Sequence, residues 1–206
     1  MIETKSLEFS YDNSFVFKFP NIKLKSNENL LVLGNSGIGK STLLHNLAGI
    51  LRPKSGSIKI FDQDISKLSE LELDNFRGQN IGIIFQRSHF VNSLTVGENL
   101  ELAQFLGNNK KGNIQETLDS LKILDKVNKK PKELSQGERQ RASIALAIIN
   151  SPKLILADEP TSSLDDTNCS NVIKILKEQA LKYQAQLIVI THDSRLKKHF
   201  KKSISL

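Results

Sequence analysis

The sequence lacks the features that would place it in a membrane or outside the cell. Its longest uninterrupted apolar run covers only residues 144–149, whereas a membrane-spanning helix needs about 20 residues. The N-terminus has an acid at its third position and no apolar stretch of the kind that a secretory signal carries. The single cysteine, Cys169, cannot form an internal disulfide, and no Cys/His cluster has zinc spacing. We therefore expect a protein of the reducing cytoplasm.

Tryptophan is absent and aromatic residues make up only 6% of the chain. Even so, 38% hydrophobic and 25% charged residues are ordinary for a globular protein, so the chain is not of the disordered class. A length of 206 residues fits one domain, 1–206, with at most a modest insertion. The sequence thus has enough apolar residues for a substantial core.

Acidic residues are missing from the end of the chain. The net charge is +7, and +5 of it comes from cations within residues 195–206, namely Arg195, Lys197, Lys198, Lys201 and Lys202. The simpler interpretation is a solvated face on a last helix. The alternative is a contact with anionic lipid, an acidic loop of a partner or nucleic acid.

Short apolar strand patterns alternate with helical patterns, which is typical of an α/β protein with a mostly parallel sheet. The expected core strands cover residues 30–33, 154–157 and 187–190, and a helix is expected over 40–50. Shorter, partly alternating patterns near the start predict a small antiparallel sheet, at residues 6–11, 15–24 and 57–61.

Between residues 87 and 151 the strand signal disappears and helical patterns dominate. We expect an all-helical subdomain over 87–151, inserted into a core formed by 1–86 and 152–206. The sequence predicts where two of its helices begin, because Thr95 and Ser135 are each followed three residues later by a glutamate, as in a capping box. Ser69 has the same arrangement in the core. Residues 106–112 are expected to form a polar turn between helices.

A glycine-rich segment follows the first core strand and fits the pattern G-x-x-x-x-G-K-S. It consists of Gly34, Asn35, Ser36, Gly37, Ile38, Gly39, Lys40, Ser41 and the following Thr42. In this pattern the backbone N–H groups bind phosphate oxygens, the lysine neutralises the terminal phosphates and the serine hydroxyl ligates Mg²⁺. An apolar strand before it and a helix after it are the required context, so the segment predicts a nucleotide site.

Two carboxylates, Asp158 and Glu159, follow the apolar strand 154–157. Ligands of open α/β sheets bind at the carboxyl ends of the strands, so both side chains are expected at the site edge. Asp158 is expected to hold Mg²⁺. Glu159 is expected to orient and deprotonate the water that attacks the γ-phosphorus of ATP.

With these motifs in place, the whole chain resembles the nucleotide-binding subunit of an ATP-binding-cassette (ABC) transporter. Four further segments match that family in the expected order: Gln86 matches the glutamine loop, 134–138 the family signature, 162–165 the D-loop and His192 the switch histidine. Tyr11, 23 residues before Gly34, matches the aromatic residue that stacks on adenine.

The resemblance implies ATP hydrolysis with Mg²⁺ and a role for each matched residue. Gln86 would contact Mg²⁺ and the attacking water, and His192 would sense the γ-phosphate. Ser135, Gly137 and Glu138 would serve the γ-phosphate of a second subunit in a head-to-tail dimer, the simpler form of which is a homodimer. Asp165 would bridge the two sites across the interface.

The signature segment departs from the commonest form of the family at two positions, Gln136 and Glu138. Gln136 is expected in the first helical turn, where no glycine is required, so the backbone donor should survive. Glu138 can complete the capping box. Its charge beside a phosphate would slow or tune closure of the dimer.

The loop 87–91 after the glutamine supports two interpretations. Exposed Phe90 and Val91 would suit a groove that accepts a helix of a membrane subunit. Alternatively, these side chains pack under the helical subdomain.

The short insertion and the segment 132–141 look most like the lipoprotein-releasing, macrolide-exporting and cell-division branch of the family. This resemblance implies a polytopic permease as partner, with the chain peripheral on the cytoplasmic face of the membrane and no direct contact with nucleic acid. The alternative is a soluble ABC ATPase that acts on nucleic acid or the ribosome, for which the basic end of the chain is the only support.

Overall fold

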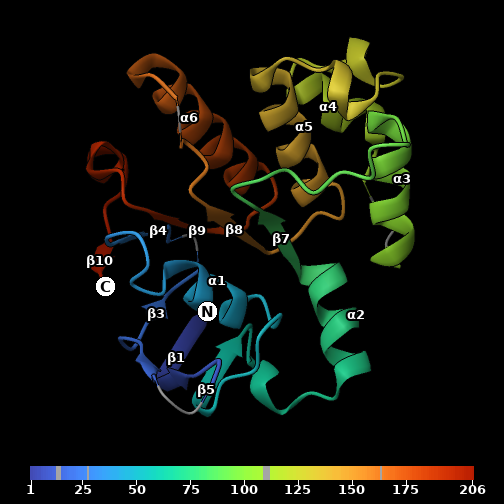
Figure 1. The fold of residues 1–206 in the computed structure, drawn as a ribbon. Helices are drawn as coiled ribbons and strands as arrows, with labels where there is room; N and C mark the ends of the chain where they lie inside the picture. Colours follow the sequence, from blue (N-terminus) through green and yellow to red (C-terminus); the bar gives the residue numbers. More distant parts are fainter. Residues whose placement is uncertain (13–14, 27, 109–111, 163) are drawn as a thin grey trace.

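The structure is a computed structural model that describes residues 1–206 except 13–14, 27, 109–111 and 163 (Figure 1). The strands are β1 Ile2–Phe9, β2 Phe17–Lys18, β3 Lys23–Leu24, β4 Leu30–Leu33, β5 Ser55–Ile60, β6 Gln63–Asp64, β7 Ile81–Ile84, β8 Leu154–Asp158, β9 Gln186–Thr191 and β10 Ser203–Ser205. The α-helices are α1 Lys40–Leu47, α2 Glu70–Asn80, α3 Val96–Leu106, α4 Ile114–Ser120, α5 Gln136–Ile148 and α6 Asp166–Lys182. Short 3₁₀ helices are η1 Ile65–Lys67, η2 Leu124–Lys126, η3 Pro131–Glu133 and η4 Ser194–His199.

The central sheet is parallel and has the strand order β10-β4-β9-β8-β7. In its register Leu33 of β4 lies beside Thr191 of β9, and Asp158 of β8 lies beside Ile190. The carboxyl ends of β4, β9, β8 and β7 therefore follow one another along a single edge. This confirms the expected α/β class and places the loops that carry the predicted motifs next to one another.

The first strands form a second, antiparallel sheet in which β1 pairs with β2, β3 and β5. Helix α1 lies between this sheet and the central one (Figure 1). One hydrophobic cluster joins the three layers and includes Ile60 of β5, Leu43 of α1, and Val32 and Ile190 of the central sheet. The predicted small antiparallel sheet is confirmed.

The opposite face of the central sheet carries the remaining helices. Leu31 and Val189 point into a second cluster, with Ile144 of α5 and Ile173 of α6. Adjacent strand residues such as Leu31 and Val32 thus belong to different clusters, as expected for a strand buried on both faces. Cys169 is buried in this second cluster.

The described part of 87–151 contains helices and turns but no strand, as the sequence predicts. The three predicted capping boxes, at Ser69, Thr95 and Ser135, are all formed. Within the predicted turn 106–112, residues 109–111 lie outside the described residues. No helix in the described part of the chain is both long and apolar enough to span a bilayer.

Three local expectations need correction. Strand β1 covers Ile2–Phe9 rather than residues 6–11, and Ser6, with a positive φ of 48°, lies at a break in its pairing with β5. Helix α1 ends at Leu47 rather than residue 50, since Gly49 turns the chain with a φ of 65°. The expected last helix is only the 3₁₀ helix η4, and the chain then enters β10, which pairs with β4. Strand β7 was not predicted.

Candidate functional site

The glycine-rich segment lies between β4 and the start of α1, at the carboxyl edge of the central sheet. Gly37 and Gly39 have φ values of 83° and 103°, which side chains rarely adopt. A Cβ on Gly39 would lie 2.6 Å from Cδ1 of Phe17, so only glycine fits there. Gly39 is also the N-cap residue of α1, and it has no side chain that could accept a hydrogen bond from the first turn of the helix. The first N–H groups of α1 therefore suit an anion.

Lys40, the first residue of α1, turns its ammonium group back toward this segment. Its Nζ donates hydrogen bonds to the carbonyl oxygens of Gly34 and Asn35, at 2.9 and 3.0 Å. Nζ also lies 3.4 Å from Oε1 of Glu159. Exposure is only 6% for Lys40 and 8% for Glu159, so the pair is well shielded from water.

Glu159 follows β8 and accepts hydrogen bonds from the end of the neighbouring strand β9. The Thr191 hydroxyl donates to Oε2 at 2.7 Å, and the His192 backbone N–H donates to Oε1 at 3.0 Å. Nδ1 of His192 lies 3.0 Å from Oε1, so Nε2 is the ring nitrogen that can meet a bound phosphate. The φ of Glu159 is 47°, a strained value for this residue type and one that is typical of functional sites.

The carboxyl group of Asp158, at the end of β8, is buried beside Ser41. Burial raises the pKa of Asp158 above its usual range, the nearby Glu159 adds to the rise, and a hydrogen bond with the Ser41 side chain opposes it. Among the described residues, no hydrogen-bond partner meets the buried Oδ1 of Asp158. A carboxylate oxygen without a partner beside a hydroxyl is the kind of donor set that Mg²⁺ uses, so the residues present fit this ion.

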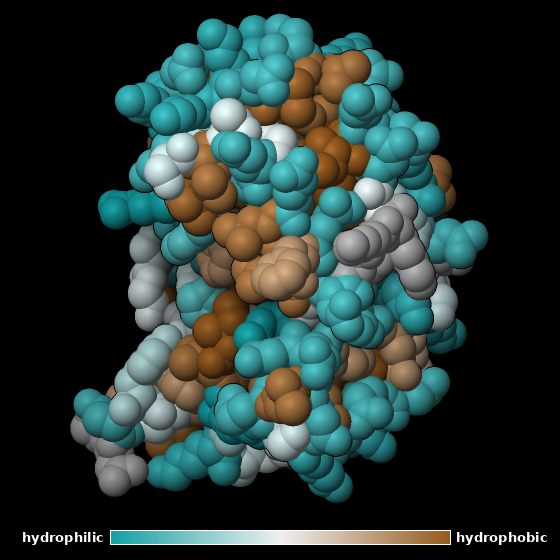
Figure 2. All heavy atoms as spheres, turned by 90° about the vertical axis from the view of Figure 1, so that its right-hand side faces the viewer, coloured by the Kyte–Doolittle hydropathy of each residue, from teal (hydrophilic) through white to brown (hydrophobic). Residues whose placement is uncertain are grey.

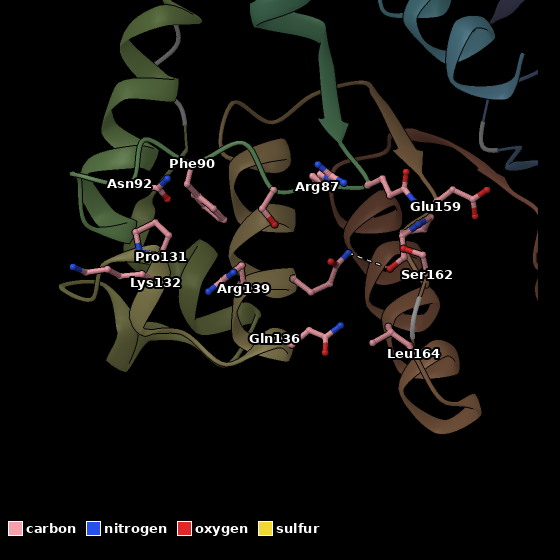
Figure 3. A pocket seen from close by; sticks show the side chains of 14 residues that line it. Arg87, Phe90, Asn92, Pro131, Lys132, Gln136, Arg139, Glu159, Ser162 and Leu164 are labelled. Atoms are coloured by element: carbon pink, nitrogen blue, oxygen red, sulfur yellow. Dashed lines mark hydrogen bonds between the residues drawn. The ribbon is translucent and has the colours of Figure 1, made fainter. Parts of the chain in front are cut away.

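Gln86 follows β7 and lines a cleft of about 590 Å³ that also reaches Glu159 (Figure 3). The cleft lies between this edge of the sheet and the start of α5, from which Gln136 and Arg139 extend into it (Figure 3). Gln140 of α5 donates a hydrogen bond to the carbonyl oxygen of Pro160 at 3.2 Å, the dashed line in Figure 3. Gln86 is thus placed near Glu159 while it remains exposed.

The signature residues lie at the start of α5 and interact locally. The Ser135 N–H donates to Oε2 of Glu138 at 2.9 Å, and Glu138 forms an ion pair with Lys126 at 3.3 Å. The hydrogen bonds from Ser135, and to a smaller extent the contact with Lys126, hold the pKa of Glu138 below its usual range. Gly137 has open space where a Cβ would lie. The described contacts of Ser135 and Glu138 do not bring them to Lys40 in the same chain.

Two further predicted residues lie apart from the Lys40–Glu159 pair. Tyr11 is 65% exposed, and its hydroxyl lies 3.0 Å from Oγ1 of Thr42 in α1, which places the ring beside the glycine-rich segment. Asp165 caps α6 by accepting the Asn168 N–H at 2.8 Å. Ser163, which belongs to the predicted D-loop, lies outside the described residues.

In the loop 87–91, each of the two interpretations holds for one residue. Phe90 packs against the core cluster under the helices, whereas Val91 is exposed. Sequence reasoning did not identify Thr191, although its hydroxyl donates to Glu159. Thr191 directly precedes His192, but no motif demands a hydroxyl at that position.

Comparison with known proteins gives one consistent family. The family model described as "ABC transporter" matches residues 17–162. The lipoprotein-releasing system ATP-binding protein LolD of Wigglesworthia glossinidia brevipalpis is 33% identical over 207 residues, covering 98% of this chain and 90% of LolD.

Solved structures agree with this match. The dimeric ATP-binding cassette MJ0796, in a post-hydrolysis state bound to ADP and Pi, has a TM-score of 0.87 at 29% identity, covering all of this chain and 94% of the other. CbiO1 from Clostridium perfringens, part of the ABC transporter complex cbiONQ, has a TM-score of 0.86 at 27% identity, covering 99% of this chain and 83% of the other.

Proposed function

The chain belongs to the ABC transporter family as an ATP-binding subunit and ATPase, and we propose that it drives a separate membrane permease through ATP-dependent closure and opening of a dimer. The observation that carries the proposal is the Lys40–Glu159–His192 cluster at the end of the glycine-rich segment, formed at the ends of three neighbouring strands of one sheet edge, β4, β9 and β8. Such a cluster can bind a triphosphate, position water and respond to loss of the terminal phosphate.

Within this cluster each residue has a separate task. Lys40 and the N–H groups of the glycine-rich segment bind the terminal phosphates. Glu159 orients and deprotonates the attacking water, while Thr191 and the His192 backbone fix the direction of its carboxylate. Nε2 of His192 contacts the γ-phosphate, and Tyr11 stacks on the adenine.

Ser41 and Asp158 would hold Mg²⁺, and Gln86 would close the site from β7. The unpartnered Oδ1 of Asp158 supports this assignment among the described residues. When bound, the ion neutralises charge on the phosphates. The task of Asp158 is to remain ionised in a buried position, and that of Gln86 is to reach the site from a loop that also contacts α5.

A second copy of the chain completes each site. Ser135 is the N-cap residue of α5 and Gly137 lies in its first turn, and the open space at Gly137 leaves room for a phosphate from another chain. A head-to-tail homodimer would place this helix start on the γ-phosphate of the partner. The dimeric structures of the similar cassette MJ0796 support this arrangement.

The permease is proposed to dock in a groove of about 550 Å³ between α2 and β7 on one side and α3 and α5 on the other. Figure 2, which turns this side of the molecule to the viewer, shows hydrophobic residues gathered across the middle of the face. Ile83, Phe85 and Leu106 line the groove, and Leu106 is 72% exposed. An apolar groove of this size suits the nonpolar face of a helix.

The likeness to LolD, which is named as the ATP-binding protein of a lipoprotein-releasing system, supports a permease of that type as the partner. We propose that the chain is peripheral on the cytoplasmic face of the membrane and transmits a mechanical stroke to this permease. The basic end of the chain gives less support to a ribosomal or nucleic-acid role than its charge suggests. Arg195 and Lys202, two of its five cations, are already held in ion pairs with acids of the same chain.

The experiment uses the Glu159→Gln variant, purified with ATP from detergent-solubilised cells, and identifies the proteins that accompany it. A stoichiometric polytopic membrane protein supports the proposal, whereas ribosomal proteins or nucleic acid would replace it with the alternative. Leu106→Glu in the same background should release the permease. Leu181→Glu is the matched control, because Leu181 is 81% exposed on α6 and does not line the groove.

A further inference from the structure

We propose that Arg195 is a positioning residue that couples the loop carrying His192 to the D-loop segment at the start of α6. Arg195 lies in η4, three residues after His192. The inference rests on the proposed function, because it takes the D-loop segment around Asp165 to face the second subunit. Arg195 then links the carboxylate of Glu159 in one site to the part of the chain that meets the other site.

In the segment that follows His192, Arg195 binds the carboxylate of Asp193 through two nitrogen atoms. Its Nε lies 2.9 Å from Oδ1 of Asp193, and its Nη2 lies 2.7 Å from Oδ2. This guanidinium is the largest cause that holds the pKa of Asp193 below its usual range. The carboxylate of Asp193 is therefore a fixed anchor for the loop directly after His192.

From Asp193 the contacts continue to the catalytic carboxylate. The Asp193 backbone N–H donates to Oγ1 of Thr191 at 2.9 Å, and this hydroxyl donates to Oε2 of Glu159 at 2.7 Å. His192 lies between the two, with its backbone N–H and its Nδ1 also on Glu159. A shift of Asp193 would therefore change the direction of both the Glu159 carboxylate and the His192 ring.

On the other side, Arg195 reaches the segment that enters α6. Its Nη1 forms an ion pair with Asp166, the first residue of α6, and its Nη2 donates to the carbonyl oxygen of Leu164 at 3.4 Å. Leu164 and Asp166 flank Asp165, which caps the helix. One planar guanidinium thus joins two segments that are about 30 residues apart in sequence, which the single ammonium of a lysine cannot reproduce.

Because the ion pair between Arg195 and Asp166 is exposed, a role of Arg195 in coupling can be distinguished from a role in folding. The Arg195 side chain is 44% exposed and that of Asp166 is 84% exposed, and exposed ion pairs contribute little to folding stability. Loss of the contact with Asp166 should leave the fold intact. It should change turnover, because small misplacements of catalytic groups reduce rates strongly.

The test measures kcat, KM for ATP and the Hill coefficient of the purified full chain with Arg195→Ala and with Asp166→Asn. Asp166→Asn weakens only the contact to α6 and leaves the contact of two nitrogen atoms with Asp193. This variant therefore still tests the inference if Arg195→Ala does not fold. We expect kcat to fall about tenfold in both, because misplacement of catalytic groups reduces the rate. KM should stay within about twofold because Lys40 and Tyr11 are not touched, and the Hill coefficient should fall toward 1.

Two control variants accompany them. Lys197→Ala removes an exposed cation from the same turn without a contact to Asp193 or Asp166 and should behave as wild type. Asp166→Glu keeps the charge and should restore most of kcat. The inference is overturned if Arg195→Ala and Asp166→Asn retain wild-type kcat and Hill coefficient, or if KM rises in parallel with the loss of kcat. Absence of a permease from the purification would count against the proposed partner alone.

Discussion

The ammonium of Lys40 and the carboxylate of Glu159 lie 3.4 Å apart, and both residues are almost fully buried. The group expected to bind the terminal phosphates thus pairs with the group expected to activate water. Lys40 is further held by the carbonyl oxygens of Gly34 and Asn35. A bound triphosphate has to draw Lys40 away from these partners, so the release of Glu159 as a base depends on the nucleotide.

Lys40→Ala should abolish ATP turnover. Removal of a preorganised positive charge from a water-excluded site costs about 100- to 1,000-fold or more in rate. Among the described residues, the Glu159 carboxylate would keep His192 and Thr191 as partners. Phosphate release by the purified variant measures the effect, with circular dichroism to establish that it is folded. Turnover at the wild-type rate would show that the site is assigned wrongly.

Glu159→Gln should retain ATP and accumulate as a dimer, because closure precedes hydrolysis and the amide cannot take a proton from water. The amide keeps the shape of the side chain and one acceptor for Thr191. Light scattering after size-exclusion chromatography, with and without ATP, gives the mass of the particle. A variant that stays monomeric at saturating ATP would contradict the head-to-tail dimer.

Tyr11→Ala should raise KM for ATP about fivefold, the equivalent of about 1 kcal/mol of aromatic stacking. Tyr11→Phe is the matched control, since it keeps the ring and loses only the hydroxyl contact to Thr42. Its KM should stay close to that of wild type. If both variants change KM equally, the hydroxyl rather than the ring is responsible, and the stacking assignment fails.

Asp158→Asn should abolish Mg²⁺-dependent turnover, by about 100-fold or more, and should raise the Tm of the metal-free protein at neutral pH. Burial raises the folded pKa of Asp158 above its unfolded value, so ionisation costs stability as the pH rises from about 3.9 to the folded pKa. Asparagine avoids that cost.

Thermal unfolding of both proteins between about pH 2.5 and pH 7 tests the stability part of this prediction. The difference in Tm should vanish at the acidic end, where the carboxyl group of Asp158 is protonated in the folded and the unfolded chain alike. A difference that stays the same at every pH would show that the charge of Asp158 is not its cause.

The sequence by itself determined the local features of this protein. The glycine-rich segment before Lys40, the capping box at Ser135 and the apolar strand before Asp158 each depend on residues a few positions apart, and all three form as predicted. Their order along the chain was also sufficient to indicate the family, since each motif sits at a strand end or a helix start.

Only the tertiary structure decided how these features meet. Strand β9 pairs between β4 and β8, and this position brings Thr191 and His192 against Glu159. Pairing between strands far apart in sequence depends on the packing of both faces of the sheet, which no local pattern encodes. The same reason explains why β10 and the contacts of Arg195 could not be foreseen, because they depend on which distant segments lie side by side.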